Sequence, residues 1–307
     1  MIHPTPIFVI GMERSGTKWL TSILRKHPEI AAPESPEGGV FEASFENFNY
    51  HFPDLTRPDD YIACVELFSK TDLFEKLNID KDYFYKIENK PSNYYQLLGL
   101  AFDKYAESNN SKYWIQKASP RVIKYLLNNF KNARFIIIKR NLVDNIKSKM
   151  ASTLMSTGSK RMYHKIFQYA LQEKFIIKLS HNKETIKTVD YKDLKINQAN
   201  VIRSILELLN LEFNYNLLIE NKENIFHSKF QNDNQRQKIL NKQEVHFAKI
   251  FYFFMKLLPS GMLKFIHKVF SKPKYKMIAG TFSTIMLKHN LLYKKNKLDD
   301  IIKSGND

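Results

Sequence analysis

The residues best suited to chemistry form a short basic segment near the start of the chain. A tight loop runs from Gly11 to Gly16 and carries Arg14, and Lys18 follows two residues later. The loop comes after an apolar, β-branched run at residues 6–10, typical of a buried strand, and before apolar residues at helical spacing. In such a unit, backbone N–H groups at the helix start point at a bound anion, and the helix dipole favours negative charge. We therefore predict an anion-binding site here.

The spacing of this loop differs from that of the nucleotide-binding P-loop. In the P-loop the second glycine is followed by Lys and then by Ser or Thr. Here Thr17 precedes Lys18, so the lysine side chain leaves the helix about 100° further round. This difference weakens the interpretation as a nucleotide-triphosphate-dependent kinase, which stays open. A plain strand-to-helix turn with basic residues facing water is the simplest alternative.

A second candidate phosphate site follows the most hydrophobic run in the chain, at residues 135–138. Arg140 leaves the carboxyl end of this predicted strand, and Ser148 lies about two turns into a predicted helix at 142–150. A guanidinium suits phosphate because its planar fork donates two parallel hydrogen bonds. The strand ends in basic residues, which repel Mg²⁺, and this argues further against a kinase.

Alternating strands and helices must position these residues. The predicted strands lie at 6–10, 113–116, 135–138 and 186–191. The predicted helices lie at 92–107, 119–129, 142–150 and 198–209, with a pair between 60 and 78. This alternation is typical of an α/β fold whose central parallel sheet is covered by helices on both faces. Ligands of such sheets bind outside the carboxyl ends of the strands, where both basic loops would lie.

The two motifs resemble those of sulfotransferases that use 3′-phosphoadenosine 5′-phosphosulfate (PAPS). In that family, a loop reading Arg-Ser-Gly-Thr after a strand holds the 5′-phosphosulfate. The resemblance implies this role for Arg14, Ser15, Gly16, Thr17 and Lys18. The family's strand-Arg pattern, with Ser eight residues later, implies that Arg140 and Ser148 hold the 3′-phosphate. It also implies that Trp19 lies against the adenine, although a place in the helix core suits Trp19 equally well.

Two further segments are similar to this family. WIQKASPRV, at 114–122, resembles its strand-Lys-Ser/Thr-Pro segment, which implies that Lys117 faces the sulfonate. TVDYKDL, at 188–194, resembles its late-strand segment. Together the four segments cover about residues 6–215, and they imply a three-layer, P-loop-like fold of the broad bacterial and carbohydrate sulfotransferase type. Arg14, Lys18 and Lys117 would then neutralise charge that grows on the bridging oxygen and the sulfonate.

The catalytic base is implied by the same resemblance. Cytosolic small-molecule members carry a His two residues after the lysine, where this chain has Ser119. Bacterial and carbohydrate members use a Glu after the first helix, and the segment HPEIAAPESPEGGVF implies Glu37, with Glu34 and Glu42 as alternatives. A placed carboxylate can take the proton that an acceptor hydroxyl loses as it attacks sulfur.

The chain departs from the family pattern at three positions near the expected site. Glu13 stands where the family usually has Pro, and an acidic residue beside a phosphate site is unusual. Pro36 replaces the lysine before the base, and Leu142 replaces a common Pro after Arg140 and its neighbour.

Composition limits the class of protein. The chain has 307 residues, 43% hydrophobic and 26% charged, which predicts a globular protein. We expect one domain over 1–307, with a core at about 6–215 and a helical, basic C-terminal extension at about 222–307. No apolar run approaches the ~20 residues of a membrane span, and the start lacks a signal-peptide pattern. The single Cys64 excludes an internal disulfide and a cysteine-rich metal site, and it suits a reducing compartment. We expect a cytoplasmic or membrane-peripheral protein.

The net charge of +17 bounds the partners. It fits anionic ligands, an acidic polymer or a membrane surface, although a solvated lysine-rich surface is the simplest explanation. No nucleic-acid-binding motif is recognisable, and we expect no nucleic-acid partner and no metal. The aromatic-rich segment at 244–258 either covers the sheet or forms a basic amphipathic surface for a membrane. We expect a sugar, glycolipid or anionic glycan as acceptor. A small alcohol, and a non-catalytic binder of nucleotides or acidic polymers, stay open.

Overall fold

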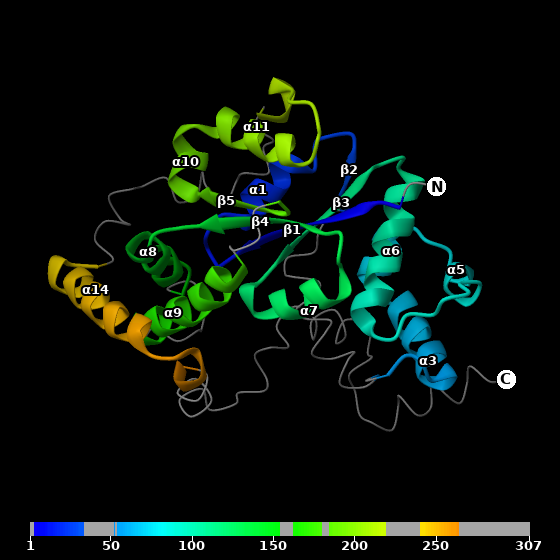
Figure 1. The fold of residues 1–307 in the computed structure, drawn as a ribbon, viewed down its shortest axis with the longest axis horizontal. Helices are drawn as coiled ribbons and strands as arrows, with labels where there is room; N and C mark the ends of the chain where they lie inside the picture. Colours follow the sequence, from blue (N-terminus) through cyan, green and yellow to red (C-terminus); the bar gives the residue numbers. More distant parts are fainter. Residues whose placement is uncertain are drawn as a thin grey trace.

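A parallel sheet runs through the described part of the chain in this computed structural model, which describes residues 3–33, 52, 54–153, 162–179, 184–218 and 240–263 (Figure 1). Its strands have the order β2-β3-β1-β4-β5, and every neighbouring pair is parallel. Their bounds are β1 Thr5–Gly11, β2 Ile30–Ala31, β3 Tyr113–Ala118, β4 Arg134–Lys139 and β5 Ile186–Asp190. The predicted strands and the α/β class are confirmed. β2 was not predicted, because two residues are too few to show a period.

Helices connect the strands and largely match the prediction. The helices between β1 and β3 are α1 Thr17–Leu24, α3 Pro58–Ser69, α4 Asp72–Leu77, α5 Asp82–Tyr85 and α6 Tyr94–Ser108. Those that follow are η1 Pro120–Val122, α7 Ile123–Asn129, α8 Leu142–Thr153, α9 Met162–Leu179, α10 Tyr191–Ile196, α11 Gln198–Leu208, η2 Tyr215–Leu218 and α14 Lys242–Leu257. Sequence patterning missed α9, which packs against α8, η1 and α14. A helix covered on several sides lacks the single apolar stripe that reveals a surface helix.

Capping residues set several helix starts. Pro58 begins α3 and Pro120 begins η1, since proline is tolerated in a first turn. The side chain of Asn93 accepts from two backbone N–H groups at the start of α6. α4 begins at Asp72, and its N-cap is Thr71, whose hydroxyl accepts from the Phe74 N–H.

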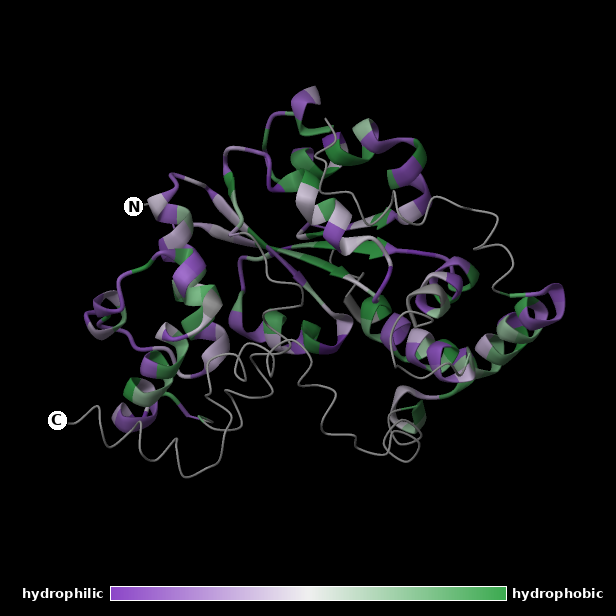
Figure 2. Cartoon of the chain, turned by 180° about the vertical axis from the view of Figure 1, so that it is seen from behind, coloured by the Kyte–Doolittle hydropathy of each residue, from purple (hydrophilic) through white to green (hydrophobic). Residues whose placement is uncertain are grey.

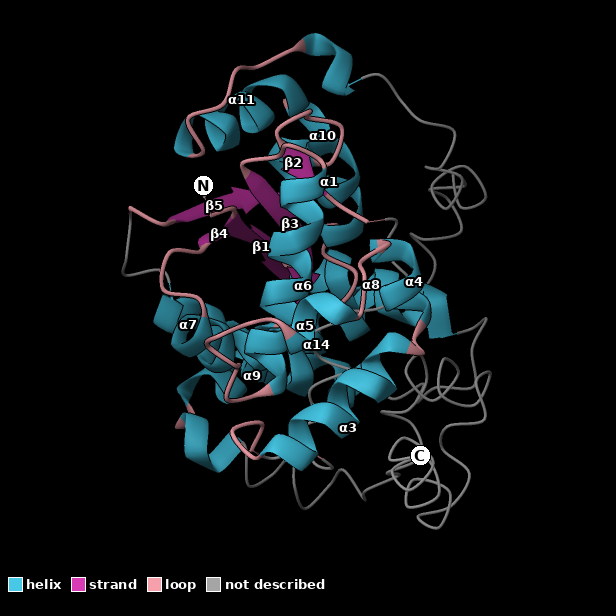
Figure 3. Cartoon of the chain, turned by 90° about the vertical axis from the view of Figure 1, so that its right-hand side faces the viewer, coloured by secondary structure: helices cyan, strands magenta, loops and turns pink. Residues whose placement is uncertain are grey.

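Alternation along the strands divides the core into two layers. Ile7 and Val9 of β1 face a cluster built by α1 and α11, whereas Phe8 and Ile10 face a cluster built by α6, α7, α8 and α9. The strands are accordingly apolar on both faces, which is the rule for a buried parallel sheet, and Figure 2 shows apolar residues along the central strands. Figure 3 shows the resulting three layers, with α10 and α11 on one side of the strands and α7 and α9 on the other.

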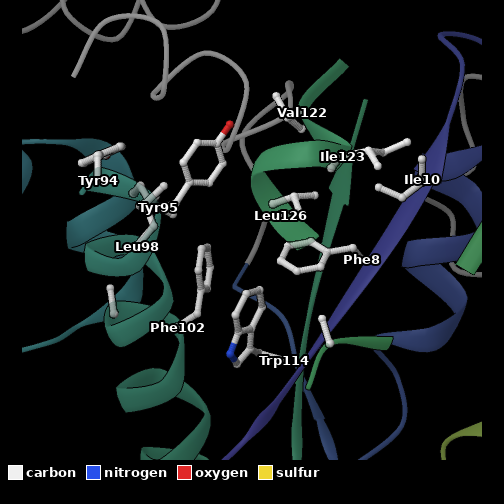
Figure 4. Packing of buried hydrophobic residues seen from close by; sticks show 14 of the residues in the cluster. Phe8, Ile10, Tyr94, Tyr95, Leu98, Phe102, Trp114, Val122, Ile123 and Leu126 are labelled. Carbon is white, nitrogen blue, oxygen red and sulfur yellow. The ribbon is translucent and has the colours of Figure 1, made fainter. Parts of the chain in front are cut away.

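Aromatic side chains fill the second cluster (Figure 4). Trp114 is fully buried, meets Phe8 edge-on at 5.4 Å between ring centroids, and stacks on Phe102 at 5.0 Å. Its indole N–H donates to Asp103 at 2.7 Å, so the buried polar atom is satisfied. This packing fixes β3 against α6 and thereby fixes the strand that carries Lys117.

The expected C-terminal extension is described only at residues 240–263. There α14 packs against α9 and α8, on the same side of the sheet as α7. Within the described residues, no helix combines the length and apolar character needed to cross a membrane.

Candidate functional site

Two basic loops meet at the carboxyl edge of the sheet. In the parallel register Val9 lies beside Lys117 on one neighbouring strand and beside Ile136 on the other, so the loops that follow β1, β3 and β4 leave the same edge. The guanidinium of Arg140 reaches across and donates from Nη1 to the carbonyl oxygen of Arg14 at 2.8 Å. The structure therefore brings together the two segments that the sequence assigned to separate phosphates.

The loop between β1 and α1 is shaped by its glycines. Gly16 has φ 98°, in the left-handed region, and a Cβ there would lie 2.6 Å from the ring of Tyr191. A Cβ on Gly11 would lie 2.5 Å from the Ser15 hydroxyl. Buried Ser15 closes the turn by donating both its N–H and its hydroxyl to the Met12 carbonyl. The two glycines thus allow a close turn that ends at the start of α1.

The start of α1 favours an anion. No side chain caps it, and its first turn holds no acidic residue. Thr17 is its first residue, and Lys18, in the same turn, is exposed to solvent. Backbone N–H groups, the helix dipole and a lysine charge therefore act at one place.

Arg140 is held by aromatic residues as well as by the loop. Its guanidinium carbon lies 4.3 Å from the centre of the Tyr191 ring, a cation–π distance. Its own carbonyl accepts from the hydroxyl of Tyr169 at 2.7 Å. Burial raises the pKa of Tyr169 above its usual range, so that hydroxyl keeps its proton. The Tyr191 ring at the start of α10 and the Arg14 carbonyl thus preorganise the guanidinium, while Tyr169 of α9 holds the backbone of Arg140.

Sequence analysis missed Tyr191 as a site residue. It covers Gly16, faces Arg140 and meets Trp19 edge-on at 6.0 Å between ring centroids. A signal for it existed, since it is the last residue of the predicted strand at 186–191 and must lie at the same sheet edge as the two loops. Trp19 is partly buried and packs beside the α1 cluster, which is compatible with both interpretations offered for it.

The first half of α8 faces the β1–α1 loop. Asn145 donates from Nδ2 to the Glu13 carbonyl at 2.9 Å. Residues three or four apart share a helix face, so partly buried Ser148 and buried Lys149 lie on the side that faces this loop. Ser148 therefore stands on the loop side of α8, as the resemblance requires of a phosphate ligand.

The unusual Glu13 has basic counterparts. Its charge acts on two lysines, Lys149 of α8 and Lys165 of α9, and in each case it opposes the effect of burial on the ammonium group. Burial is the main cause that lowers the pKa of Lys149 to about 8, and the charges of Lys165 and Arg121 lower it further. The acidic residue thus compensates positive charge on the neighbouring helices.

Lys117 and Leu142 lie within the described residues, whereas the predicted catalytic base does not. Lys117 is partly buried near the end of β3. Leu142 is 8% exposed, so the departure from the family's Pro places an apolar side chain in the core. Glu34, Pro36, Glu37 and Glu42 lie outside the described residues, and the assignment of the base stays a prediction. Within the described residues, no group of three His, Cys, Asp or Glu side chains gathers as a metal site would require.

The chain belongs to the sulfotransferase family. The model of that family matches residues 6–215, which is more than half of the chain. The match begins at β1 and ends at η2, so it includes both basic loops and all the strands described above. No curated protein matches the chain.

Solved sulfotransferase structures resemble the fold at low sequence identity. The sulfotransferase domain of the curacin biosynthetic pathway is 19% identical, with 71% of this chain and 79% of that chain covered and a TM-score of 0.47. The sulfotransferase domain of the Synechococcus PCC 7002 olefin synthase is 17% identical, with 72% and 80% covered and a TM-score of 0.49. A sulfotransferase from Alicyclobacillus acidocaldarius is 18% identical, with 77% and 94% covered and a TM-score of 0.42.

Proposed function

We propose that this chain transfers a sulfonate group from PAPS to a hydroxyl or amine of an acceptor. The observation that carries the proposal is the junction of the two basic loops, where Arg140 donates to the Arg14 carbonyl. A donor that carries phosphate on both its 3′ and 5′ sides needs two anion subsites at one sheet edge. The junction supports this donor because it joins two basic loops at that edge, and membership of the sulfotransferase family gives the class of reaction.

The chemistry of the residues fits such a donor. The loop that ends at Gly16 and the uncapped start of α1 suit the 5′-phosphosulfate, with Arg14 and Lys18 adding charge. Arg140 suits the 3′-phosphate because the Tyr191 ring and the Arg14 carbonyl already orient its guanidinium, and Ser148 offers a hydroxyl from the facing side of α8. Trp19 and Tyr191 offer aromatic surfaces for the adenine.

The chain's own residues would assist the transfer in two ways. The acceptor hydroxyl must lose a proton as it bonds to sulfur, while adenosine 3′,5′-bisphosphate leaves. Glu37 takes that proton, with Glu34 and Glu42 as alternatives. Arg14, Lys18 and Lys117 stabilise the charge that develops on the leaving oxygen and the sulfonate. This chemistry requires no metal.

The acceptor we propose is a sugar, glycolipid or anionic glycan. Its support is the net charge of +17, which favours an anionic acceptor or surface. A screen with labelled PAPS against neutral sugars, glycolipids, sulfated glycans and small alcohols tests this part, and labelling of small alcohols alone would overturn it.

Titration calorimetry tests the donor. We expect adenosine 3′,5′-bisphosphate to bind more tightly than either ATP with Mg²⁺ or a heparin-like polymer. A kinase would prefer ATP with Mg²⁺, and a non-catalytic binder of acidic polymers would prefer the heparin-like polymer. Arg140→Ala should cost about 1.5–3 kcal/mol of affinity for the bisphosphate, roughly 10- to 150-fold, and far less for adenosine 5′-monophosphate. Arg203→Ala is the matched control, because that guanidinium also lies over a ring, Phe213, at 4.7 Å but on α11. Equal losses with both nucleotides would refute the 3′-phosphate role.

The base is tested by turnover. Glu37→Gln keeps the shape of the side chain and removes its basicity, so it should leave bisphosphate affinity within about twofold and lower turnover ~100-fold or more. Glu34→Gln and Glu42→Gln are the controls. Normal turnover by Glu37→Gln, with one of the controls inactive, would move the assignment to that residue.

A further inference from the structure

One face of α14 leaves large apolar side chains in solvent. Their exposed fractions run from 44% to 66%, and they belong to Phe247, Ile250, Phe253, Phe254 and Leu257. Met262, just beyond the helix, is 52% exposed. Figure 2 shows apolar positions along this helix, at the right-hand side of the view. Scattered single apolar residues are ordinary on a surface, but five on one helix form a patch of the kind that binds something.

The five residues make one continuous stripe. At about 100° per residue, positions 247, 250, 253, 254 and 257 fall within an arc of roughly 120° around the helix axis. Three exposed lysines, Lys242, Lys249 and Lys256, recur every seven residues and fall in the next 60° or so. The apolar stripe (these five residues) and the lysine row (these three) therefore run side by side along the helix.

The opposite face of α14 is fixed to the protein. Ala248 is fully buried, and the Tyr252 ring meets Tyr169 edge-on at 5.6 Å while its hydroxyl donates to Glu173 of α9. Lys174 of α9 donates to the Leu258 carbonyl at the carboxyl end of the helix. The helix cannot rotate its stripe inward without breaking these contacts, so the stripe is held outward.

Charge indicates what the stripe contacts. Glu244 is the one acidic residue between 242 and 257, and its carboxylate is engaged in the capping box with Asn241. The helix is thus basic beside its apolar stripe, on a chain whose net charge is +17. An apolar face flanked by lysines is typical of a helix that lies in the plane of a lipid surface. The apolar part of each lysine side chain lies along the helix, and its ammonium group reaches the lipid headgroups.

We propose that the apolar stripe and lysine row of α14 bind the protein to an anionic lipid surface. The stripe inserts among acyl chains and the lysines contact the headgroups. Because α14 packs on α9 and on α8, the helix that follows Arg140, docking in this way joins the domain that carries the candidate site to the membrane. This binding does not depend on which reaction the site performs.

Vesicle sedimentation of the full chain tests the proposal. Vesicles of phosphatidylcholine with about a third of phosphatidylglycerol should bind the protein, and pure phosphatidylcholine should bind it much less. Each lysine near such a surface contributes about fivefold to binding, from about 1 kcal/mol. Lys249→Glu with Lys256→Glu should therefore lose at least about 25-fold, and Phe253→Gln with Phe254→Gln at least about tenfold.

Controls separate the stripe from general basicity. Lys192→Glu with Lys195→Glu makes the same change in net charge on α10, on the other side of the sheet, and should lose far less binding. Ile196→Gln removes a side chain that is 72% exposed on α10 and should lose none. All the substituted side chains are exposed, so the variants should keep the wild-type unfolding midpoint.

Three outcomes would overturn the proposal. One is a full chain that stays in solution with the anionic vesicles, as it would if another part of the chain covered the stripe. A second is an equal loss from the α10 and α14 lysine variants, which would indicate general electrostatic attraction. The third is a dimer in analytical ultracentrifugation that Phe253→Gln with Phe254→Gln converts to monomer without altering vesicle binding, which would make the stripe a self-association surface.

Discussion

Lys149→Met should stabilise the protein at neutral pH. Lys149 is 2% exposed, and burial lowers the pKa of its ammonium group from 10.5 to about 8. Each pKa unit corresponds to 1.36 kcal/mol, so holding the charged form in the folded state costs about 3 kcal/mol. Methionine has a similar unbranched shape and carries no charge. The free energy of unfolding should therefore rise by about 3 kcal/mol at pH 7, less whatever Glu13 loses when its counterpart is removed.

The stability gained by Lys149→Met should depend on pH. Below pH 8 both the folded and the unfolded chain hold the proton, and the full cost is present. Between about pH 8 and 10.5 the unfolded chain binds the proton that the folded chain has released, so the wild type gains stability as pH rises. Above about pH 10.5 neither state is charged at this position. The advantage of Lys149→Met over the wild type should shrink across this window and disappear above it.

Urea unfolding of both proteins at pH 7 and pH 10.5 measures the difference. Lys147→Met, two residues away on the same helix and partly exposed, is the matched control and should stay within about 0.5 kcal/mol of the wild type at both pH values. Lower stability of Lys149→Met at pH 7 would refute the reasoning, because the attraction of Glu13 would then outweigh the cost of burial. A gain that is the same at both pH values would refute it too, since it would come from packing.

Three other changes test the loop, the core and the aromatic contact. Gly16→Ala places a side chain on left-handed backbone, which costs about 1–2 kcal/mol of stability, and pushes it into the Tyr191 ring. Urea unfolding should show this loss of stability, and calorimetry should show at least a tenfold loss of bisphosphate affinity. Burial raises the pKa of Asp103 from 3.8 to about 6, so the fold loses stability as pH rises between these values. In urea unfolding, Asp103→Asn should therefore add up to about 3 kcal/mol at pH 7.5 and little at pH 4. Trp19→Ala should stay folded by circular dichroism but bind the bisphosphate less tightly, because Tyr191 loses its edge-on partner; unfolding would favour a purely structural role for Trp19.

The strands and the anion-binding loop could be predicted because their signals are local. The continuous apolar runs of β1 and β4 are required by a sheet buried on both faces, and Gly11 and Gly16 mark the turn between strand and helix. β4, the most hydrophobic predicted strand, is internal, between β1 and β5, and β1 holds the central place.

The contacts that hold the site could not be predicted in the same way. The bond from Arg140 to Arg14 joins residues 126 apart, and no local pattern sets such a distance. The burial of Lys149 depends on α9, whose own pattern was obscured by being covered on several sides. The role of Glu37 comes from resemblance and stays a prediction.

The central position of β1 has a consequence for how the chain is made. Its hydrogen-bonded neighbours, β3 and β4, lie more than a hundred residues later in the sequence. At a synthesis rate of roughly 5–20 residues per second, the first strand leaves the ribosome many seconds before either partner exists. Its run of fully buried residues, Ile7 to Ile10, is exposed during that interval. During synthesis the chain therefore exposes an apolar strand until β3 and β4 are made, and this interval is when aggregation through β1 is most favoured.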